Sequence, residues 1–224
     1  MSDTRVSRGH RGRLVLFLLS ALVVFATMYV LYSAIDTLRR LEVAESERDQ
    51  WQRPAEVLQA LDLRPGDVVV DLGSGAGYFA LKLSPLVGKE GQVSAVDIRK
   101  LSLSFLWVRT LLSQKRNIRV VLSDEDNPHL PSSAVDAVLI ANTFHELRDP
   151  KVILDHLSRA LRVGGRLVVV DRGPRQNGSH AHEVERSSVE AELREVGFEI
   201  VQSQDPFIDR PGDDLWWLTV ARRR

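Results

Sequence analysis

An uncharged apolar segment near the N-terminus limits what this 224-residue chain can fold into more than any other feature does. Residues 14–35 read LVLFLLSALVVFATMYVLYSAI and contain no charged residue, no glycine and no proline. As a helix this segment would be roughly 33 Å long, and the hydrocarbon core of a bilayer is about 30 Å thick. We therefore expect residues 14–35 to form one transmembrane helix.

Two other interpretations of this segment stay open, a buried core helix and a cleaved signal peptide. A signal peptide has a shorter apolar region and small residues at its cleavage site, whereas the best candidate site here, Tyr32-Ser33-Ala34, begins with a bulky tyrosine. Positive charge does not decide the orientation, because four arginines lie in residues 1–13 and four more lie in residues 36–55.

The apolar segment divides the chain into four expected parts. These are an Arg-rich tail (1–13), the transmembrane helix (14–35), a polar helical linker (36–50) and a globular domain (51–224). The 30 Lys and Arg balance the 30 Asp and Glu, but the tail has four Arg and one Asp, so the remainder is slightly acidic. This charge balance argues against a nucleic-acid partner. The chain has no cysteine, which excludes disulfides, thiolate metal ligands and thiol catalysis.

Apolar runs that alternate with helical patterns predict an α/β fold for the globular domain. The expected strands cover residues 68–72, 92–98, 118–122, 134–141, 166–171, 198–203 and 215–221. The expected helices cover residues 54–61, 78–87, 100–115, 150–162 and 188–196. We expect a Rossmann-like, mostly parallel seven-stranded sheet with helices on both faces, and the last two strands predict an antiparallel edge. The segment 100–115 is apolar on more than one face, which indicates core burial or a patch that contacts a bilayer or a partner.

A glycine-rich loop follows the first expected strand, in the sequence VVDLGSGAGYF. Gly73, Gly75 and Gly77 let the backbone turn sharply and let a ligand approach, and the following helix offers free N–H groups. The dinucleotide-binding fingerprint requires Gly or Ala at the sixth position of G-x-G-x-x-G, where this chain has Tyr78. A nicotinamide-dependent oxidoreductase is therefore the weaker alternative.

Two aspartates flank this loop at the ends of expected strands. Asp97 ends the second strand, where a carboxylate can accept hydrogen bonds from both ribose hydroxyls. Asp71 precedes the loop, where a carboxylate would repel a pyrophosphate and favour a cationic amino-acid moiety. The two acids together favour S-adenosylmethionine as the cofactor.

The globular domain resembles the class I S-adenosylmethionine-dependent methyltransferases, within them a group of uncharacterised bacterial proteins with N-terminal export or anchor segments. The resemblance rests on VVDLGSGAG (69–77), AVDI (95–98), SDEDN (123–127), VDAVLIANTFHEL (135–147) and LRVGGRLVVVD (161–171). It implies seven strands, the last antiparallel, with the cofactor across the carboxyl ends of the first strands.

The resemblance also implies roles for individual residues. The methionine part would meet Asp71 and the loop Gly73, Ser74, Gly75 and Gly77. The ribose would meet Asp97, the adenine ring would pack on Ile98, and the adenine amino group would meet Asp124 or its neighbour Glu125.

Candidate catalytic residues follow the fourth expected strand, in Asn142-Thr143-Phe144-His145-Glu146. Asn142 could hold an amine or the cofactor backbone. His145 titrates near neutral pH and could act as a general base that Glu146 orients, or either residue could bind only local backbone. We expect no metal site, since the His180-Ala181-His182 segment and the acids Asp124 to Asp126 are weak candidates.

These features predict a membrane-anchored methyltransferase that acts on a small or lipid-like acceptor, such as a phospholipid amine or a quinone-type phenol. The alternative is a catalytically silent cofactor-binding domain that serves membrane-linked interaction or sensing. Because the cofactor is made in the cytosol, we expect a single-pass protein of the bacterial inner membrane with a cytoplasmic catalytic domain. The missing cysteines argue against thiol-relayed arsenite methylation and against cysteine-adduct methylation of pyrimidine C5.

Overall fold

The computed structural model describes residues 6–174, 182–210 and 214–224 and divides the chain into two units that meet between Arg48 and Asp49. The first unit consists of most of helix α1 (Val6–Trp51), which contains the apolar segment and continues through the expected linker. The apolar stretch of α1 is exposed, unlike a core helix, and is long and apolar enough to cross a membrane. A signal sequence near the N-terminus would also be long and apolar enough to meet this criterion.

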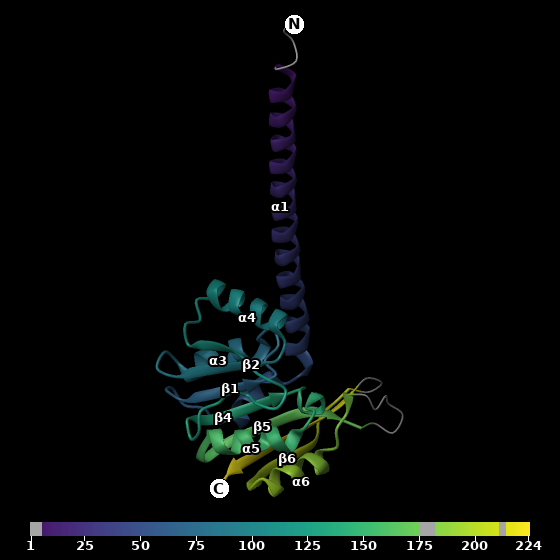
Figure 1. The fold of residues 1–224 in the computed structure, drawn as a ribbon. Coiled ribbons are helices and arrows are strands. Elements are labelled where there is room, and N and C mark those ends of the chain that lie inside the picture. The colour runs from purple at the N-terminus through teal and green to yellow at the C-terminus, as the bar shows by residue number, and fades with distance from the viewer. Residues whose placement is uncertain (1–5, 175–181, 211–213) are drawn as a thin grey trace. The chain divides into compact units, whose positions relative to one another are not determined.

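The second unit is built around a seven-stranded sheet (Figure 1). Its strands are β1 (Val68–Leu72), β2 (Gln92–Asp97), β3 (Ile118–Leu122), β4 (Val135–Ala141), β5 (Leu161–Gly173), β6 (Phe198–Asp209) and β7 (Leu215–Arg223). The spatial order is β3-β2-β1-β4-β5-β7-β6. β7 runs antiparallel to both β5 and β6, and the other neighbouring strands are parallel to each other. The structure confirms the predicted fold class. The strand order reverses between β1 and β4, where open α/β sheets bind their ligands.

Helices cover both faces of this sheet (Figure 1). They are α2 (Pro54–Ala60), α3 (Tyr78–Val87), α4 (Lys100–Leu112), α5 (Pro150–Ala160) and α6 (Arg186–Glu195), with a short 3₁₀ helix η1 (Phe144–Glu146) after β4. One core packs α2, α3 and α4 against the sheet, and a second core packs α5 and α6 on the other face. Trp216 and Trp217 are adjacent in β7, so they point to opposite faces, and each is buried in a different core.

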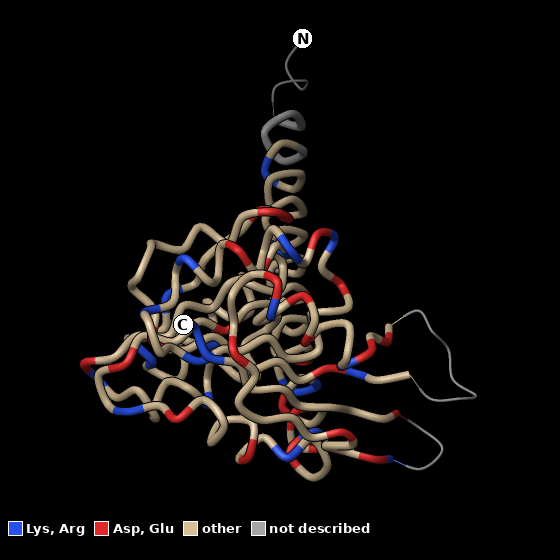
Figure 2. The backbone as a smooth tube through the Cα atoms, turned by 90° about the horizontal axis from the view of Figure 1, so that it is seen from below, with Lys and Arg blue, Asp and Glu red and all other residues tan. Residues whose placement is uncertain are grey.

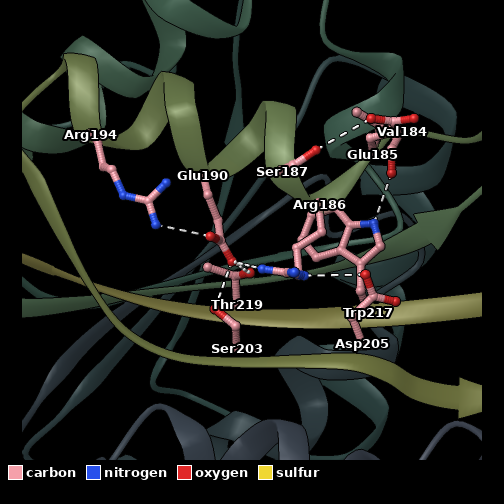
Figure 3. A network of polar contacts seen from close by, with 10 residues as sticks. All are labelled: Val184, Glu185, Arg186, Ser187, Glu190, Arg194, Ser203, Asp205, Trp217 and Thr219. Carbon is pink, nitrogen blue, oxygen red and sulfur yellow. Dashed lines mark hydrogen bonds and ion pairs between the residues drawn. The ribbon is translucent and has the colours of Figure 1, made fainter.

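A buried carboxylate fastens α6 to the last two strands (Figure 3). Glu190 Oε1 accepts hydrogen bonds from Ser203 Oγ at 2.6 Å, from Thr219 Oγ1 at 3.2 Å and from Arg186. Its Oε2 accepts one from Arg194 at 3.0 Å. Burial raises the pKa of Glu190, but the hydrogen bonds from Ser203, Arg186 and Arg194 outweigh burial and leave that pKa below its usual value. The ionised form of Glu190 is therefore the one that the fold uses.

Helix α4 is buried along only one side. Leu103, Leu106 and Thr110 face the core, whereas the outward side carries exposed apolar residues. The exposed residues are Leu101 (72%), Trp107 (56%), Leu111 (57%) and Leu112 (70%). The core-burial interpretation of this segment therefore holds for one face of the helix and is wrong for the other. Elsewhere in the globular unit basic and acidic residues intersperse along the backbone (Figure 2).

Candidate functional site

The glycine-rich loop joins β1 to α3 and is tied to the neighbouring strand. The N–H groups of Gly73 and Ser74 donate to the carbonyl of Val96 in β2, at 2.8 and 3.0 Å. Gly73 has φ +76°, and a Cβ there would lie 2.2 Å from Thr143 Oγ1. Gly77 caps α3 with φ +94°, and a Cβ there would meet the Leu106 side chain at 2.3 Å. The loop thus needs glycine for its left-handed backbone and for the close approach of its neighbours.

Asp97, at the end of β2, accepts a hydrogen bond from this loop. Its Oδ2 accepts a hydrogen bond from Gly75 N–H at 2.8 Å, and its Oδ1 accepts one from Arg99 N–H at 2.8 Å. The side chain is 2% exposed. Each carboxylate oxygen has a second lone-pair direction, so Asp97 can still accept hydrogen bonds from a ligand. Around Gly75, by contrast, a Cβ would meet nothing within 4 Å, which leaves open space in front of the loop.

A pocket of about 210 Å³ opens beside Asp97 at the carboxyl ends of the strands. Its walls come from the end of β1, the turn into α4, the loop after β3 and the segment after β4; they include Leu72, Gly73, Asp97, Ile98, Asp124, Glu125, Thr143 and Glu146. Ile98 is 52% exposed and presents an apolar surface to this pocket. The lining therefore combines apolar and acidic groups, as a site for an adenosine moiety requires.

Two of the acids at this pocket are partly engaged with basic residues. Asp124 is exposed and lies 2.9 Å from His129 Nε2, and Glu125 pairs with Arg148 at 3.2 Å. Both face the pocket, so the choice between Asp124 and Glu125 as an adenine ligand stays open.

Two polar atoms beside the loop are buried and lack a hydrogen-bond partner among the residues that the structure describes. They are Ser74 Oγ and Asn142 Oδ1. Asn142 follows β4 with φ +56°, a left-handed backbone that asparagine tolerates better than most residues. Asp71, one residue before the end of β1, is 3% exposed. A buried polar atom without a partner costs stability, so Ser74 and Asn142 are suited to a polar ligand.

His145 lies in η1 and forms a buried pair with Asp171 at the end of β5. His145 Nδ1 lies 2.7 Å from Asp171 Oδ1, and the backbone N–H of His145 donates to Asp171 Oδ2 at 3.2 Å. The side chains of His145 and Asp171 are 5% and 0% exposed. The hydrogen bond to Asp171 raises the pKa of His145 above its usual value, while burial acts in the opposite direction. Since an ionised carboxylate only accepts, Nδ1 carries the shared proton and Nε2 stays available as an acceptor.

Glu146, which we expected to orient His145, lies nearer the other ring nitrogen, Nε2, whereas Asp171 holds Nδ1. Glu146 Oε1 lies 3.9 Å from His145 Nε2, and the Glu146 side chain is 47% exposed. The ring of His182 lies edge-on to the ring of His145, with 5.5 Å between centroids. His180 lies outside the described residues. Within residues 6–174, 182–210 and 214–224, no group of three or more His, Cys, Asp or Glu is arranged to hold a metal ion.

Asp171 is the site residue that the sequence reasoning missed. It closes the apolar run of β5 in the same way that Asp71 closes the run of β1, with VVVD in both strands. Because β4 and β5 are parallel neighbours, their carboxyl ends meet, and this places Asp171 beside the residues that follow β4. The repeated VVVD pattern was the signal that could have found it.

Comparisons with known proteins agree with this geometry. A family model described as a methyltransferase domain matches residues 70–169. The chain is 28% identical over 150 residues to a ubiquinone/menaquinone biosynthesis C-methyltransferase UbiE of Coxiella burnetii. The aligned region covers 66% of this chain and 57% of the relative. The chain is 34% identical over 119 residues to the protein of that name from Teredinibacter turnerae, covering 51% of this chain and 47% of the relative. The chain thus spans about half the length of these relatives.

A solved structure matches over a larger share of both chains. The crystal structure of a SAM-dependent methyltransferase from Aquifex aeolicus superposes with a TM-score of 0.69 at 27% identity, covering 80% of this chain and 93% of that one. The strand order, the glycine-rich loop and these matches agree with one another. The globular part of this chain therefore has the fold of the class I S-adenosylmethionine-dependent methyltransferases and is similar to them in sequence.

Proposed function

We propose that this chain transfers a methyl group from S-adenosylmethionine to a small or lipid-like acceptor, and that residues 14–35 anchor it in a membrane. One observation carries the proposal. The glycine-rich loop and the buried Asp97 together form the wall of a pocket at the point where the strand order reverses. That position and that donor set are suited to an adenosine-bearing cofactor.

The polar groups around the loop fit such a cofactor. The free oxygens of Ser74 and Asn142 can accept hydrogen bonds from the cationic amino-acid part, near the carboxylate of Asp71. Asp97 would accept from the ribose hydroxyls, and Ile98 would pack on the adenine ring. Asp124 would accept from the adenine amino group. When bound, S-adenosylmethionine supplies a methyl group activated by a sulfonium.

The chain's own catalytic contribution would be the alignment of the acceptor and the removal of its proton. His145 Nε2 would accept that proton, while Asp171 fixes the ring through Nδ1 and stabilises the resulting imidazolium. Since Asp171 raises the pKa of His145, the imidazole is a stronger base than a free histidine. Glu146, at 3.9 Å from Nε2, would add a further negative charge beside the imidazolium.

A quinone-type phenol is the acceptor class that best fits these observations. Loss of the phenolic proton to His145 would make the ring carbon nucleophilic. That carbon then takes the methyl group as the S–CH₃ bond breaks and a thioether leaves, and it loses its own hydrogen as a proton, which restores the phenol. The relatives from Coxiella and Teredinibacter are named for C-methylation in quinone biosynthesis, and a substrate of that kind dissolves in a bilayer. A phospholipid amine would remain the alternative acceptor.

We further propose that the chain is a single-pass protein of a bacterial inner membrane with its catalytic domain on the cytoplasmic side. Support comes from the long apolar part of α1 and from the cytosolic source of the cofactor. A reporter enzyme fused after Arg224 tests the orientation. A reporter that is active outside the cytoplasm would overturn the placement and would put methyl transfer itself in doubt.

The function itself is tested with the full chain in detergent micelles. Isothermal titration with S-adenosylmethionine should give saturable heat, and titration with NAD should give none. Turnover of labelled S-adenosylmethionine on extracted lipids should then fall by about two orders of magnitude in His145→Ala. His156→Ala, which removes a histidine from α5, is the matched control and should keep its activity. Binding without turnover on any extract would favour the silent cofactor-binding domain.

A further inference from the structure

We propose that the outward side of α4, together with the adjoining edge strand β3, docks on the surface of an anionic bilayer. Here the α4 face means Leu101, Trp107, Leu111 and Leu112. The inference rests on the proposed anchoring of residues 14–35 and does not depend on the methyl-transfer reaction. It adds a second membrane contact to a domain that the first contact would only tether.

The charge of this region is unlike that of the rest of the chain. Residues 98–123 contain six basic residues and no acidic residue, in a chain whose charges balance overall. The basic residues are Arg99, Lys100, Arg109, Lys115, Arg116 and Arg119. Asp97 and Asp124 mark the two ends of this acid-free segment. A surface of one sign within a neutral protein indicates a partner of the opposite charge.

Four of these cations are available to a partner. Arg99 turns to Asp97, and Arg109 donates to the carbonyl of Ala76. Within the described parts of the chain, the other four form no ion pair; they are Lys100, Lys115, Arg116 and Arg119. Lys100, Lys115 and Arg116 lie at the two ends of α4 and flank the apolar residues. Arg119 alternates with Ile118 and Val120 in β3, so it points to the other face of the sheet.

The apolar part of the surface is large for a water-exposed helix. The four residues of the α4 face are between 56% and 72% exposed. Between α4 and β3 lies a shallow hollow, whose lining includes Trp107 and Leu111 as well as Lys115 and Arg116. Apolar side chains flanked by basic ones match the interface of a bilayer, where acyl chains lie beneath anionic headgroups.

Other occupants match this surface less well. A nucleic acid would pair with the cations but would leave the leucines and Trp107 without an apolar partner. A second copy of the chain, packed through the same face, would bring like charges together. A bilayer also has the advantage of proximity, because only residues 36–48 separate the apolar segment from the globular unit. Thirteen residues span about 20 Å as a helix or about 45 Å when extended, so the domain stays near the surface.

The absence of cysteine allows a clean test with single labelled positions. Leu112→Cys on the α4 face and Val163→Cys as a matched exposed apolar control, 70% and 78% exposed in the native chain, each carry an environment-sensitive fluorophore. The full chain is reconstituted in nanodiscs of phosphatidylcholine alone or with phosphatidylglycerol. Flotation of the complexes first reports anchoring, independently of the probes.

On anionic discs we expect iodide quenching of the Leu112→Cys probe to be about fivefold weaker than on discs of phosphatidylcholine alone. Brominated lipids should quench the same probe on the anionic discs. The Val163→Cys probe should stay open to iodide. The combined Lys115→Glu and Arg116→Glu variant should restore iodide quenching at position 112 while flotation is unchanged. Equal iodide access at both positions on anionic discs would overturn the proposal. Protection that is the same on both disc types, or that occurs in dilute detergent without lipid, would equally refute an anionic bilayer as the partner.

Discussion

Replacement of Asp97 by asparagine gives the most direct test of the cofactor site. Each carboxylate oxygen of Asp97 accepts one backbone N–H, from Gly75 and from Arg99, both at 2.8 Å. Asparagine has one oxygen and one NH₂ group, so either orientation of its amide places a donor against one of these two N–H groups. One buried N–H group then loses its partner, which costs about 1–3 kcal/mol of unfolding free energy.

Cofactor affinity should fall for a second reason. A hydrogen bond to an ionised carboxylate contributes about 1.5–3 kcal/mol, so the loss of the charge should weaken S-adenosylmethionine about ten- to a hundredfold. Isothermal titration of the full chain measures the affinity, and urea unfolding measures the stability. Asp136→Asn is the matched control, because Asp136 also accepts a backbone N–H at 2.8 Å, from Val68, but lies at the opposite ends of the strands.

The two measurements separate a local role from a ribose role. Asp136→Asn should lose stability and keep the affinity of the native chain, whereas Asp97→Asn should lose both. An affinity for S-adenosylmethionine that is unchanged in Asp97→Asn would refute the assignment of Asp97 to the ribose. A loss of affinity that is equal in both variants would show that binding only follows stability.

Three further predictions address the loop, the His–Asp pair and the C-terminal strands. Gly73→Ala, whose Cβ would lie 2.2 Å from Thr143 Oγ1, should abolish detectable binding in the same titration, whereas Gly164→Ala, with φ +82° and open space around it, should bind normally. In Asp171→Asn the pKa of His145 should fall, so the acidic limb of the pH–rate profile should move to lower pH and activity should drop; an unmoved limb would exclude His145 as the base. Glu190→Gln should lower the unfolding free energy at neutral pH by about 3 kcal/mol in urea titrations. Because the pKa of Glu190 is lowered from 4.5, the native chain should lose this stability only as the pH falls below 4.5, and a variant equally acid-sensitive would contradict this role.

The sequence pattern alone predicted the bounds of elements that end at a glycine or a turn. Strand β1 has its expected bounds, because an apolar run lies between a turn and Gly73. Helix α3 has its expected bounds as well, because Gly77 and Gly88 end it on both sides. The seven strands and the antiparallel β7 follow from the same kind of pattern.

Irregular strand pairing determined the lengths of the two strands whose expected bounds were wrong. We expected β5 to begin at Arg166, after two glycines, but it begins at Leu161, because Leu161 pairs with Val135 across an irregularity in the register. Strand β6 extends to Asp209 rather than Ser203, since the second half pairs with the start of β7. Leu161 and Val135 lie 26 residues apart, where local periodicity carries no signal. The partners in β6 and β7 are close in the sequence, but their pairing crosses an irregularity in the register between Gln204 and Ile208, which alternation does not mark.

The residues of the candidate site likewise divide into those that local sequence predicted and those that depended on strand pairing. The glycine loop and Asp97 belong to one strand–loop–helix and its neighbour, so their meeting could be predicted. The partner of His145 comes from a different strand, 26 residues further along the chain, and needed the β4–β5 pairing to be known. The outward apolar side of α4 could not be distinguished from a core face, because hydrophobicity alone does not say which side of a helix lacks a neighbour.

The position of β7 also determines when this domain can be completed during synthesis. β7 lies between β5 and β6 and places Trp216 in one core and Trp217 in the other. Neither core is closed, and β6 has no partner in the sheet, until residues 215–223 have left the ribosome. The apolar segment at residues 14–35 emerges long before that point. If residues 14–35 anchor the chain as proposed, their engagement by a translocon would precede folding of the globular domain, and the nascent domain would still be an open chain when its side of the membrane is decided.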